Sequence, residues 1–266
     1  RSRNGIRTRS HALMNSAPIG VFDSGVGGLS LLRELRRLLP NEDFIYYGDR
    51  ANAPYGAKTH GEILEISKGI VDVLLSRGAK AIVVACNTAK AVAIDPLRAA
   101  YPNLPIIGIE PAVKPARVAG CKRVLVLATP VTVNESRFAA LLRTNSRDGC
   151  EFIGVPCRDL AFMIENDRTS EEIEEYLSSV FAPYRADGFD GIVLGCTHYP
   201  LVKDEITRAA GADVRVFDGS DGTARHTKAL LSELSLDSWA RKIGTVEFIS
   251  SDGSDHLERF YNKFCI

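Results

Sequence analysis

The chain lacks any apolar run approaching the roughly 20 residues that a helix needs to cross a bilayer, so membrane insertion is set aside. It also lacks a Cys-x-x-Cys pair, so neither a paired-thiol metal knuckle nor an adjacent dithiol redox centre has support. Six cysteines are scattered over 266 residues without a signal-peptide pattern. This distribution is typical of reduced thiols and predicts a cytoplasmic protein.

An excess of charge of either sign is also missing, with 33 basic and 33 acidic residues. Four arginines fall within the first 13 residues, and the remainder carries 29 basic and 33 acidic residues, a formal charge of −4. We therefore expect no nucleic-acid partner and no anionic membrane partner. We interpret residues 1–17 as a leader, derived from a tag or disordered.

Short β-rich runs recur along the rest of the chain, and several are apolar at every position, as expected of strands buried on both faces of a parallel sheet. The predicted strands are 19–22, 44–49, 81–85, 105–109, 123–128, 151–155, 191–195, 214–218 and 245–250.

Helical patterns fill the intervals between these runs. Two apolar stripes at helical spacing are Leu29, Leu32, Leu35 and Leu39, which Pro40 ends, and Ile63, Ile66, Ile70 and Val73. Thr169 and Glu172 have the spacing of a capping box. Strands alternating with helices predict βαβ units and an α/β fold with mainly parallel sheets.

Polar clusters follow four of the predicted strands, at the edge where parallel sheets gather ligands. They are Asp23-Ser24, Cys86-Asn87-Thr88, Thr129 with Thr132, and Cys196-Thr197-His198. The two cysteine clusters lie too far apart for one βαβ unit and predict two similar lobes facing each other across a cleft. We expect the first lobe to comprise 18–110 and 220–266, and the second 111–219.

Two opposed thiols suit the racemisation of an amino acid, which needs a base on one face of Cα and an acid on the other. Because the enantiomers have equal free energy, the pair must also work in reverse. We expect a helix N-terminus or a nearby cation to lower a thiol pKa toward neutrality, so that one thiolate and one thiol coexist. Backbone N–H groups and hydroxyls could hold the substrate carboxylate and stabilise the developing charge.

Six ordered motifs resemble those of the glutamate racemase family, within the aspartate/glutamate racemase superfamily. They are DSGVGG (23–28), PYG (54–56), CNTA (86–89), GIEPA (108–112), ATPVT (128–132) and GCTHYP (195–200). The resemblance covers nearly the whole chain from about Ile19. It implies a cofactor-independent isomerase that interconverts L- and D-glutamate and supplies D-glutamate for bacterial peptidoglycan, and hence for the cell wall and cell shape.

The resemblance also implies residue roles. Cys86 acts on the D enantiomer and Cys196 on the L enantiomer, assisted by Asp23, His198 and Glu165. The implied substrate contacts are Ser24, Tyr55, Gly56, Asn87, Thr88, Thr129, Thr132 and Thr197. The family forms homodimers, and some members respond to a cell-wall precursor. Two positions depart from the family pattern: Ala128 replaces a glycine, and Arg50 replaces a threonine and could alter the approach to the cleft.

Other interpretations stay open at this level. A lone buried cysteine is more often a packing residue, which is how we interpret Cys121, Cys150, Cys157 and Cys265. Asp23 or Ser24 could cap a helix starting near Gly27. The loop glycines indicate a tight turn and close approach of substrate, since their spacing is not that of a dinucleotide site.

Different functions also remain as alternatives. The two thiols with His198 could form a zinc site, although tetrahedral ligation would leave no room for substrate, and Lys90 could form a pyridoxal Schiff base. The chain could instead racemise aspartate or a hydantoin, because one methylene changes affinity little. It could also be a non-catalytic binder that closes over an amino acid.

Overall fold

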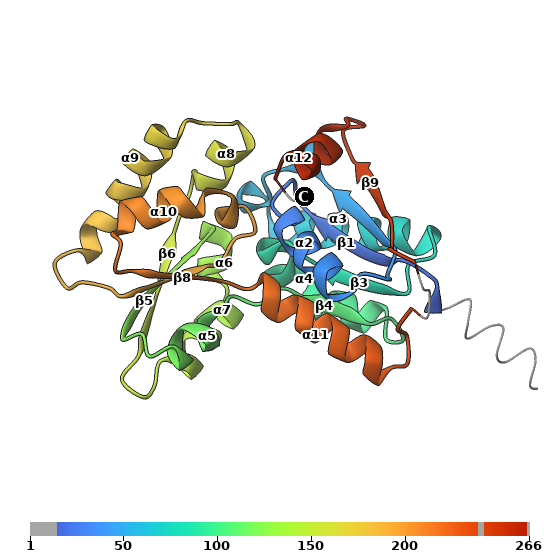
Figure 1. The fold of residues 1–266 in the computed structure, drawn as a ribbon, viewed down its shortest axis with the longest axis horizontal. Coiled ribbons are helices and arrows are strands. Elements are labelled where there is room, and N and C mark those ends of the chain that lie inside the picture. The colour runs from blue at the N-terminus through green and yellow to red at the C-terminus, as the bar shows by residue number, and fades with distance from the viewer. Residues whose placement is uncertain (1–14, 239–241, 265–266) are drawn as a thin grey trace, which may run out of the picture.

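The computed structural model describes residues 15–238 and 242–264. Most of the predicted leader, residues 1–14, and Cys265 lie outside the described residues. Two parallel sheets form the core of the structure. One has five strands in the order β4-β3-β1-β2-β9, and the other has four in the order β6-β5-β7-β8. Figure 1 shows them as two lobes side by side.

The first lobe is built from both ends of the described chain. Its strands are β1 (Ile19–Asp23), β2 (Phe44–Gly48), β3 (Ala81–Val84), β4 (Ile106–Gly108) and β9 (Val246–Ser250). Its helices are α2 (Leu29–Leu38), α3 (His60–Ser76), α4 (Asn87–Ala100), α11 (Ser220–Glu233) and α12 (His256–Phe264), with short 3₁₀ turns η1 (Arg50–Asn52) and η2 (Tyr55–Ala57).

The second lobe is continuous in sequence. Its strands are β5 (Arg123–Ala128), β6 (Glu151–Pro156), β7 (Gly191–Leu194) and β8 (Arg215–Asp218). Its helices are α5 (Val113–Val118), α6 (Pro130–Asn134), α7 (Ser136–Asn145), α8 (Leu160–Glu165), α9 (Ser170–Phe181) and α10 (Lys203–Ala210), with 3₁₀ turns η3 (Ala182–Tyr184) and η4 (Tyr199–Val202). The predicted fold class is confirmed, while the exact residue limits of the lobes stay a prediction.

Helices cover both faces of each sheet, which explains the continuously apolar strands. In β1, Ile19 and Val21 join the core under α2 and α11, whereas Phe22 joins the core under α3 and α4. In the second lobe, α8, α9 and α10 cover one face and α5 and α7 the other. Since side chains alternate along a strand, burial on both faces requires an apolar residue at every position.

The predicted leucine stripe of α2 is buried as expected, but the stripe of α3 was partly wrong. The helix buries Ile63, Ser67, Ile70 and Leu74, whereas Val73 is 37% exposed. At 3.6 residues per turn, Ser67, Val71 and Leu74 lie to one side of Ile63 on the helix surface, whereas Val73 lies to the other side, and the sheet covers only the first side. The predicted capping box at Thr169 and Glu172 is present at the start of α9.

Among the described residues, no helix has the length and apolar character of a bilayer span.

Candidate active site

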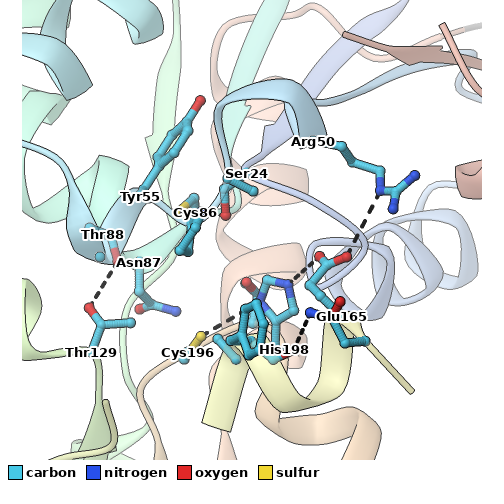
Figure 2. Close-up of a pocket in the computed structure, with 17 residues that line it drawn as sticks. Ser24, Arg50, Tyr55, Cys86, Asn87, Thr88, Thr129, Glu165, Cys196 and His198 are labelled. Atoms are coloured by element: carbon cyan, nitrogen blue, oxygen red, sulfur yellow. Dashed lines mark hydrogen bonds and ion pairs between the residues drawn. The ribbon is translucent and has the colours of Figure 1, made fainter. Parts of the chain in front are cut away.

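Residues from both lobes line one cavity of about 210 Å³. Of the predicted site residues, all but Asp23 and Thr132 line it. These are Ser24, Tyr55, Gly56, Cys86, Asn87, Thr88, Thr129, Glu165, Cys196, Thr197 and His198. Figure 2 shows Cys86 near Ser24 and Cys196 near His198 in this cavity. The carboxyl ends of β3 and β7 thus bring the two thiols together from opposite lobes.

Cys86 ends the loop after β3 and serves as the N-cap of α4. Its sulfur accepts a hydrogen bond from the Ala89 N–H at 3.5 Å, and its S–H faces the Ser24 Oγ at 3.8 Å. Burial and the charge of Asp23 nevertheless raise the pKa of the Cys86 thiol to about 12. The helix start therefore does not lower the pKa of this thiol, because desolvation outweighs one N–H donor.

Cys196 follows β7, and its sulfur lies 3.7 Å from Nδ1 of His198. The opposite ring nitrogen, Nε2, lies 2.7 Å from Oε1 of Glu165 on α8. Burial alone would lower the pKa of His198, but the hydrogen bonds to Cys196 and Glu165 raise it well above its ordinary value. A protonated imidazole beside Cys196 stabilises negative charge on that sulfur.

Glu165 is held as the anionic end of this arrangement. Burial opposes its ionisation, but hydrogen bonds from His198 and the Val26 N–H, together with the nearby Arg50, lower the pKa of its carboxyl group. The Val26 N–H donates to Oε1 from 3.0 Å. Because Val26 belongs to the first lobe, Glu165 also joins the two lobes.

Asp23 lies beneath the cavity rather than on it and is completely buried. Its Oδ1 accepts from the Ser24 hydroxyl at 3.2 Å and the Gly25 N–H at 3.1 Å, and its Oδ2 accepts from the Thr197 hydroxyl at 2.8 Å. Burial raises the pKa of Asp23, opposed by His198 and the hydrogen bonds. The capping alternative is wrong, because α2 has Gly28 as its N-cap and no side-chain cap.

Three threonine hydroxyls meet where the lobes touch. Oγ1 of Thr88 lies 3.0 Å from that of Thr129 and 3.4 Å from that of Thr132, and the last two are 2.9 Å apart. Thr132 does not line the cavity itself, and its hydroxyl contacts those of Thr88 and Thr129, which do. Beside it, Asn87 carries a buried Oδ1 without a hydrogen-bond partner in the described part of the chain. These groups can bind a polar ligand.

Sequence reasoning missed Asp49 and Asn166. Asn166 follows α8 and lines the cavity. Asp49, directly after β2, accepts a hydrogen bond from the Tyr55 hydroxyl at 2.7 Å and so positions that ring against the cavity. Its place at the carboxyl end of a strand was the available signal. Burial and Asp49 raise the pKa of Tyr55, so its hydroxyl stays a donor.

The glycines after β1 lie against side chains of the second lobe. A Cβ on Gly25 would lie 2.0 Å from Oε1 of Glu165, and one on Gly27 would lie 2.6 Å from Nδ1 of His198. These two glycines therefore make room for side chains of the second lobe, and the close approach of substrate stays a prediction.

The remaining candidates lie elsewhere. Cys121, Cys150 and Cys157 are buried in the cores of the second lobe. Lys90 does not line the main cavity, and its Nζ lies 2.6 Å from Oε1 of Glu110. Within residues 15–238 and 242–264, no three His, Cys, Asp or Glu side chains are grouped so as to hold a metal ion.

Two parallel α/β lobes each contribute one thiol to the cavity between them, which can hold a small polar ligand. Residues 19–227 match the Asp/Glu/Hydantoin racemase family, and the chain belongs to this family. The resemblance drawn from the motifs is confirmed.

Several relatives are similar over nearly their whole length. The glutamate racemase of Clostridium botulinum is 43% identical over 248 residues, which cover 92% of this chain and 96% of that one. The glutamate racemase of Clostridium perfringens is 44% identical over 240 residues, 90% of this chain and 92% of that one.

Solved structures agree with these relatives. Glutamate racemase of Francisella tularensis in complex with D-glutamate aligns with a TM-score of 0.81 and 30% identity over 94% of both chains. The Escherichia coli enzyme, solved with L-glutamate and the activator UDP-MurNAc-ala, aligns with a TM-score of 0.79 and 29% identity over 93% of this chain and 95% of that one.

Proposed function

We propose that this protein interconverts L- and D-glutamate by transferring protons at Cα between two cysteines, without a cofactor. The observation that carries the proposal is one cavity lined by Cys86 from the first lobe and Cys196 from the second. Glutamate is proposed as the substrate because the Clostridium relatives, at 43% and 44% identity, are glutamate racemases.

In this mechanism Cα lies between the two sulfurs. With L-glutamate, the Cys196 sulfur, paired with protonated His198, takes the Cα proton as a thiolate. The Cys86 thiol then delivers its proton to the opposite face, which yields D-glutamate. Cys86 is left as a thiolate and Cys196 as a thiol, the state required for the reverse reaction. Proton exchange with solvent restores the starting state.

The neighbouring groups support this cycle. The protonated His198 offsets the charge of the Cys196 thiolate, and Ser24 lies within reach of the Cys86 sulfur. The hydroxyls of Thr88 and Thr129 and the side chain of Asn87 are the proposed contacts for the substrate carboxylates and ammonium. Preorganised donors of this kind stabilise charge that develops during proton abstraction.

The experiment is polarimetry of L-glutamate in chelator-treated buffer without pyridoxal phosphate, with deuterium incorporation at Cα followed in D₂O. We expect loss of optical rotation together with deuterium uptake. Tight glutamate binding without exchange at Cα would instead indicate a binding protein. Faster turnover of L-aspartate than of L-glutamate would move the proposal to a different acid within the same family.

The biological setting is part of the same proposal. We propose that the protein works as a cytoplasmic homodimer and supplies D-glutamate for peptidoglycan synthesis. A cell-wall precursor is a proposed regulator, supported by the UDP-MurNAc-ala activator in the Escherichia coli structure. Sedimentation of the purified protein tests the dimer, and assays with and without that precursor test the regulation.

A further inference from the structure

Arg50 lies at the solvent-exposed edge of the cavity, where its side chain is 24% exposed. It belongs to the short turn η1 that follows β2. Nη1 donates to Oδ2 of Asp252 at 3.0 Å and to Oγ of Ser254 at 3.2 Å. The turn after β9 therefore anchors one side of the guanidinium group.

The other side of the guanidinium faces Glu165. Nε of Arg50 is buried and has no hydrogen-bond partner among the described residues, and it lies 3.9 Å from Oε2 of Glu165. Oε1 of Glu165 already accepts from the Val26 N–H and contacts His198. Oε2 is thus the carboxylate oxygen left to accept from Arg50, and Figure 2 shows this pair at the end of the His198–Glu165 chain.

This ion pair crosses the cleft. Arg50 and its anchor Asp252 belong to the first lobe, whereas Glu165 ends α8 of the second. A hydrogen bond needs a separation of about 2.9 Å, so closure by about 1 Å would satisfy the buried Nε–H. Because an unsatisfied buried donor is costly, a shorter contact between Arg50 and Glu165 would stabilise the pair.

We propose that Arg50 is a positioning residue that latches the two lobes across the edge of the cavity and holds Glu165 in place against His198. The inference rests on the proposed racemase function, since it concerns the same site. The charged groups that face Glu165 are Arg50, His198 and, more distantly, Asp23. Arg50 acts through Glu165 and not by contact with the reacting atoms.

A double-mutant cycle tests whether Arg50 acts through Glu165. Arg50→Met is expected to lower kcat/KM about fivefold, mainly by raising KM, because a partly exposed ion pair contributes a modest amount. In a Glu165→Gln background the same change should cost less than about twofold, since coupled residues are not additive. An undiminished effect of Arg50→Met beside Glu165→Gln would overturn the proposal and assign Arg50 to direct substrate contact.

Two further variants distinguish a specific role of Arg50 from a general loss of structure. Arg50→Lys keeps the charge and should recover most of the KM. Arg208 is a matched control, because it pairs with Glu174 at 2.7 Å and with Glu205 at 3.3 Å on the surface of the second lobe. Arg208→Met should leave both kcat and KM unchanged. An equal loss in Arg208→Met and Arg50→Met would refute a specific role for Arg50.

A measurement on the protein that does not depend on racemase activity tests this inference separately from the proposed function. The Glu165 carboxylate can be followed by ¹³C NMR of protein labelled at Glu Cδ and assigned by its absence in Glu165→Gln. Removal of the facing cation in Arg50→Met should raise the pKa of Glu165, whereas Arg208→Met should not. An unchanged pKa would refute the latch even if glutamate is racemised. Failure of wild-type protein to racemise glutamate, with the pKa still raised in Arg50→Met, would refute only the function.

Discussion

The two thiols occupy equivalent strand ends but opposite electrostatic surroundings. Cys86 has the buried Asp23 and a hydroxyl nearby, and its pKa is raised to about 12. Cys196 has a protonated imidazole 3.7 Å away, which Glu165 supports from behind. Similar backbone positions in the two lobes therefore place one thiol near a buried carboxyl group and the other beside an imidazole whose pKa is raised.

This difference does not conflict with a reversible reaction. Because L- and D-glutamate have equal free energy in an achiral solvent, kcat/KM must be equal in the two directions. The different surroundings of the two thiols can therefore make kcat and KM differ between the two directions, but not kcat/KM. In the proposed mechanism, L-glutamate is the enantiomer that meets its acid at Cys86 and its base at Cys196.

The strongest test of the comparison removes one thiol at a time. Cys86→Ala and Cys196→Ala should each lower racemisation by about 10³-fold or more, since general acid/base groups contribute on this scale. The remaining thiol should still exchange the Cα hydrogen of one enantiomer, L-glutamate in Cys86→Ala and D-glutamate in Cys196→Ala. Deuterium uptake by each enantiomer, measured by NMR, checks this. Exchange of both enantiomers by either variant would contradict the two-sided arrangement.

Removing the imidazole affects the Cys196 side alone. His198→Asn should lower kcat/KM about 10²-fold, whereas His226→Asn, at an exposed position of α11, should leave it unchanged. The raised pKa of His198 also makes a stability prediction. Its protonation stabilises the fold fully below the ordinary value of 6.5, and this contribution is lost as pH rises through the higher folded-state value.

Urea unfolding of wild type and His198→Asn over this pH range measures that contribution. The stability difference should be largest below pH 6.5 and shrink at alkaline pH. A difference that grows with pH would show that His198 is buried in its neutral form.

Removing the charge of Asp23 tests the electrostatic surroundings of Cys86. Asp23→Asn removes a negative charge that raises the pKa of Cys86. At alkaline pH, alkylation of Cys86 by iodoacetamide should become about tenfold faster, because one pKa unit is a tenfold change in thiolate. Mass spectrometry of the digest measures it. Cys157, whose pKa burial raises to about 12 without a contribution from Asp23, is the internal control and should not change.

The smallest expected effect concerns the scaffold that carries Cys196. Thr169→Ala removes the N-cap of α9 and should lower the free energy of unfolding by about 1 kcal/mol. Since Thr169 is exposed at the start of α9 and does not line the cavity, racemisation should be unchanged. Thermal unfolding and a racemisation assay check both points. A large loss of activity would mean that the Cys196 side is sensitive to any loosening of its lobe.

The strands and most of the site were predictable because they depend on local patterns. Continuously apolar runs such as 191–194 identify strands covered on both faces. Since parallel strands share one carboxyl edge, the polar residues after them belonged to one region, as Cys86, Asn87 and Thr197 show. Asp49 lay at such an edge as well, but nothing in the sequence paired it with Tyr55.

The chemistry of individual groups was less predictable. One thiol was expected to ionise more readily at a helix start or near a cation, and at Cys86 burial outweighs the helix start. Gly25 and Gly27 were expected to permit a tight turn and close approach of substrate, and the sequence did not show that they also make room for Glu165 and His198 from the other lobe. Each of these effects comes from a neighbour more than a hundred residues away or from the depth of burial, neither of which is encoded locally.

By itself, the sequence determined the strand and helix order, the family and the two thiol-bearing loops. Only the tertiary structure decided which thiol has the imidazolium, that Asp23 lies beneath the cavity, and that Arg50 faces Glu165 across the cleft. The physical reason is the distance along the chain over which each property is determined. Apolar periodicity and strand-end polarity are properties of neighbouring residues, whereas pKa values depend on desolvation and on charges that only the packing of two lobes brings together.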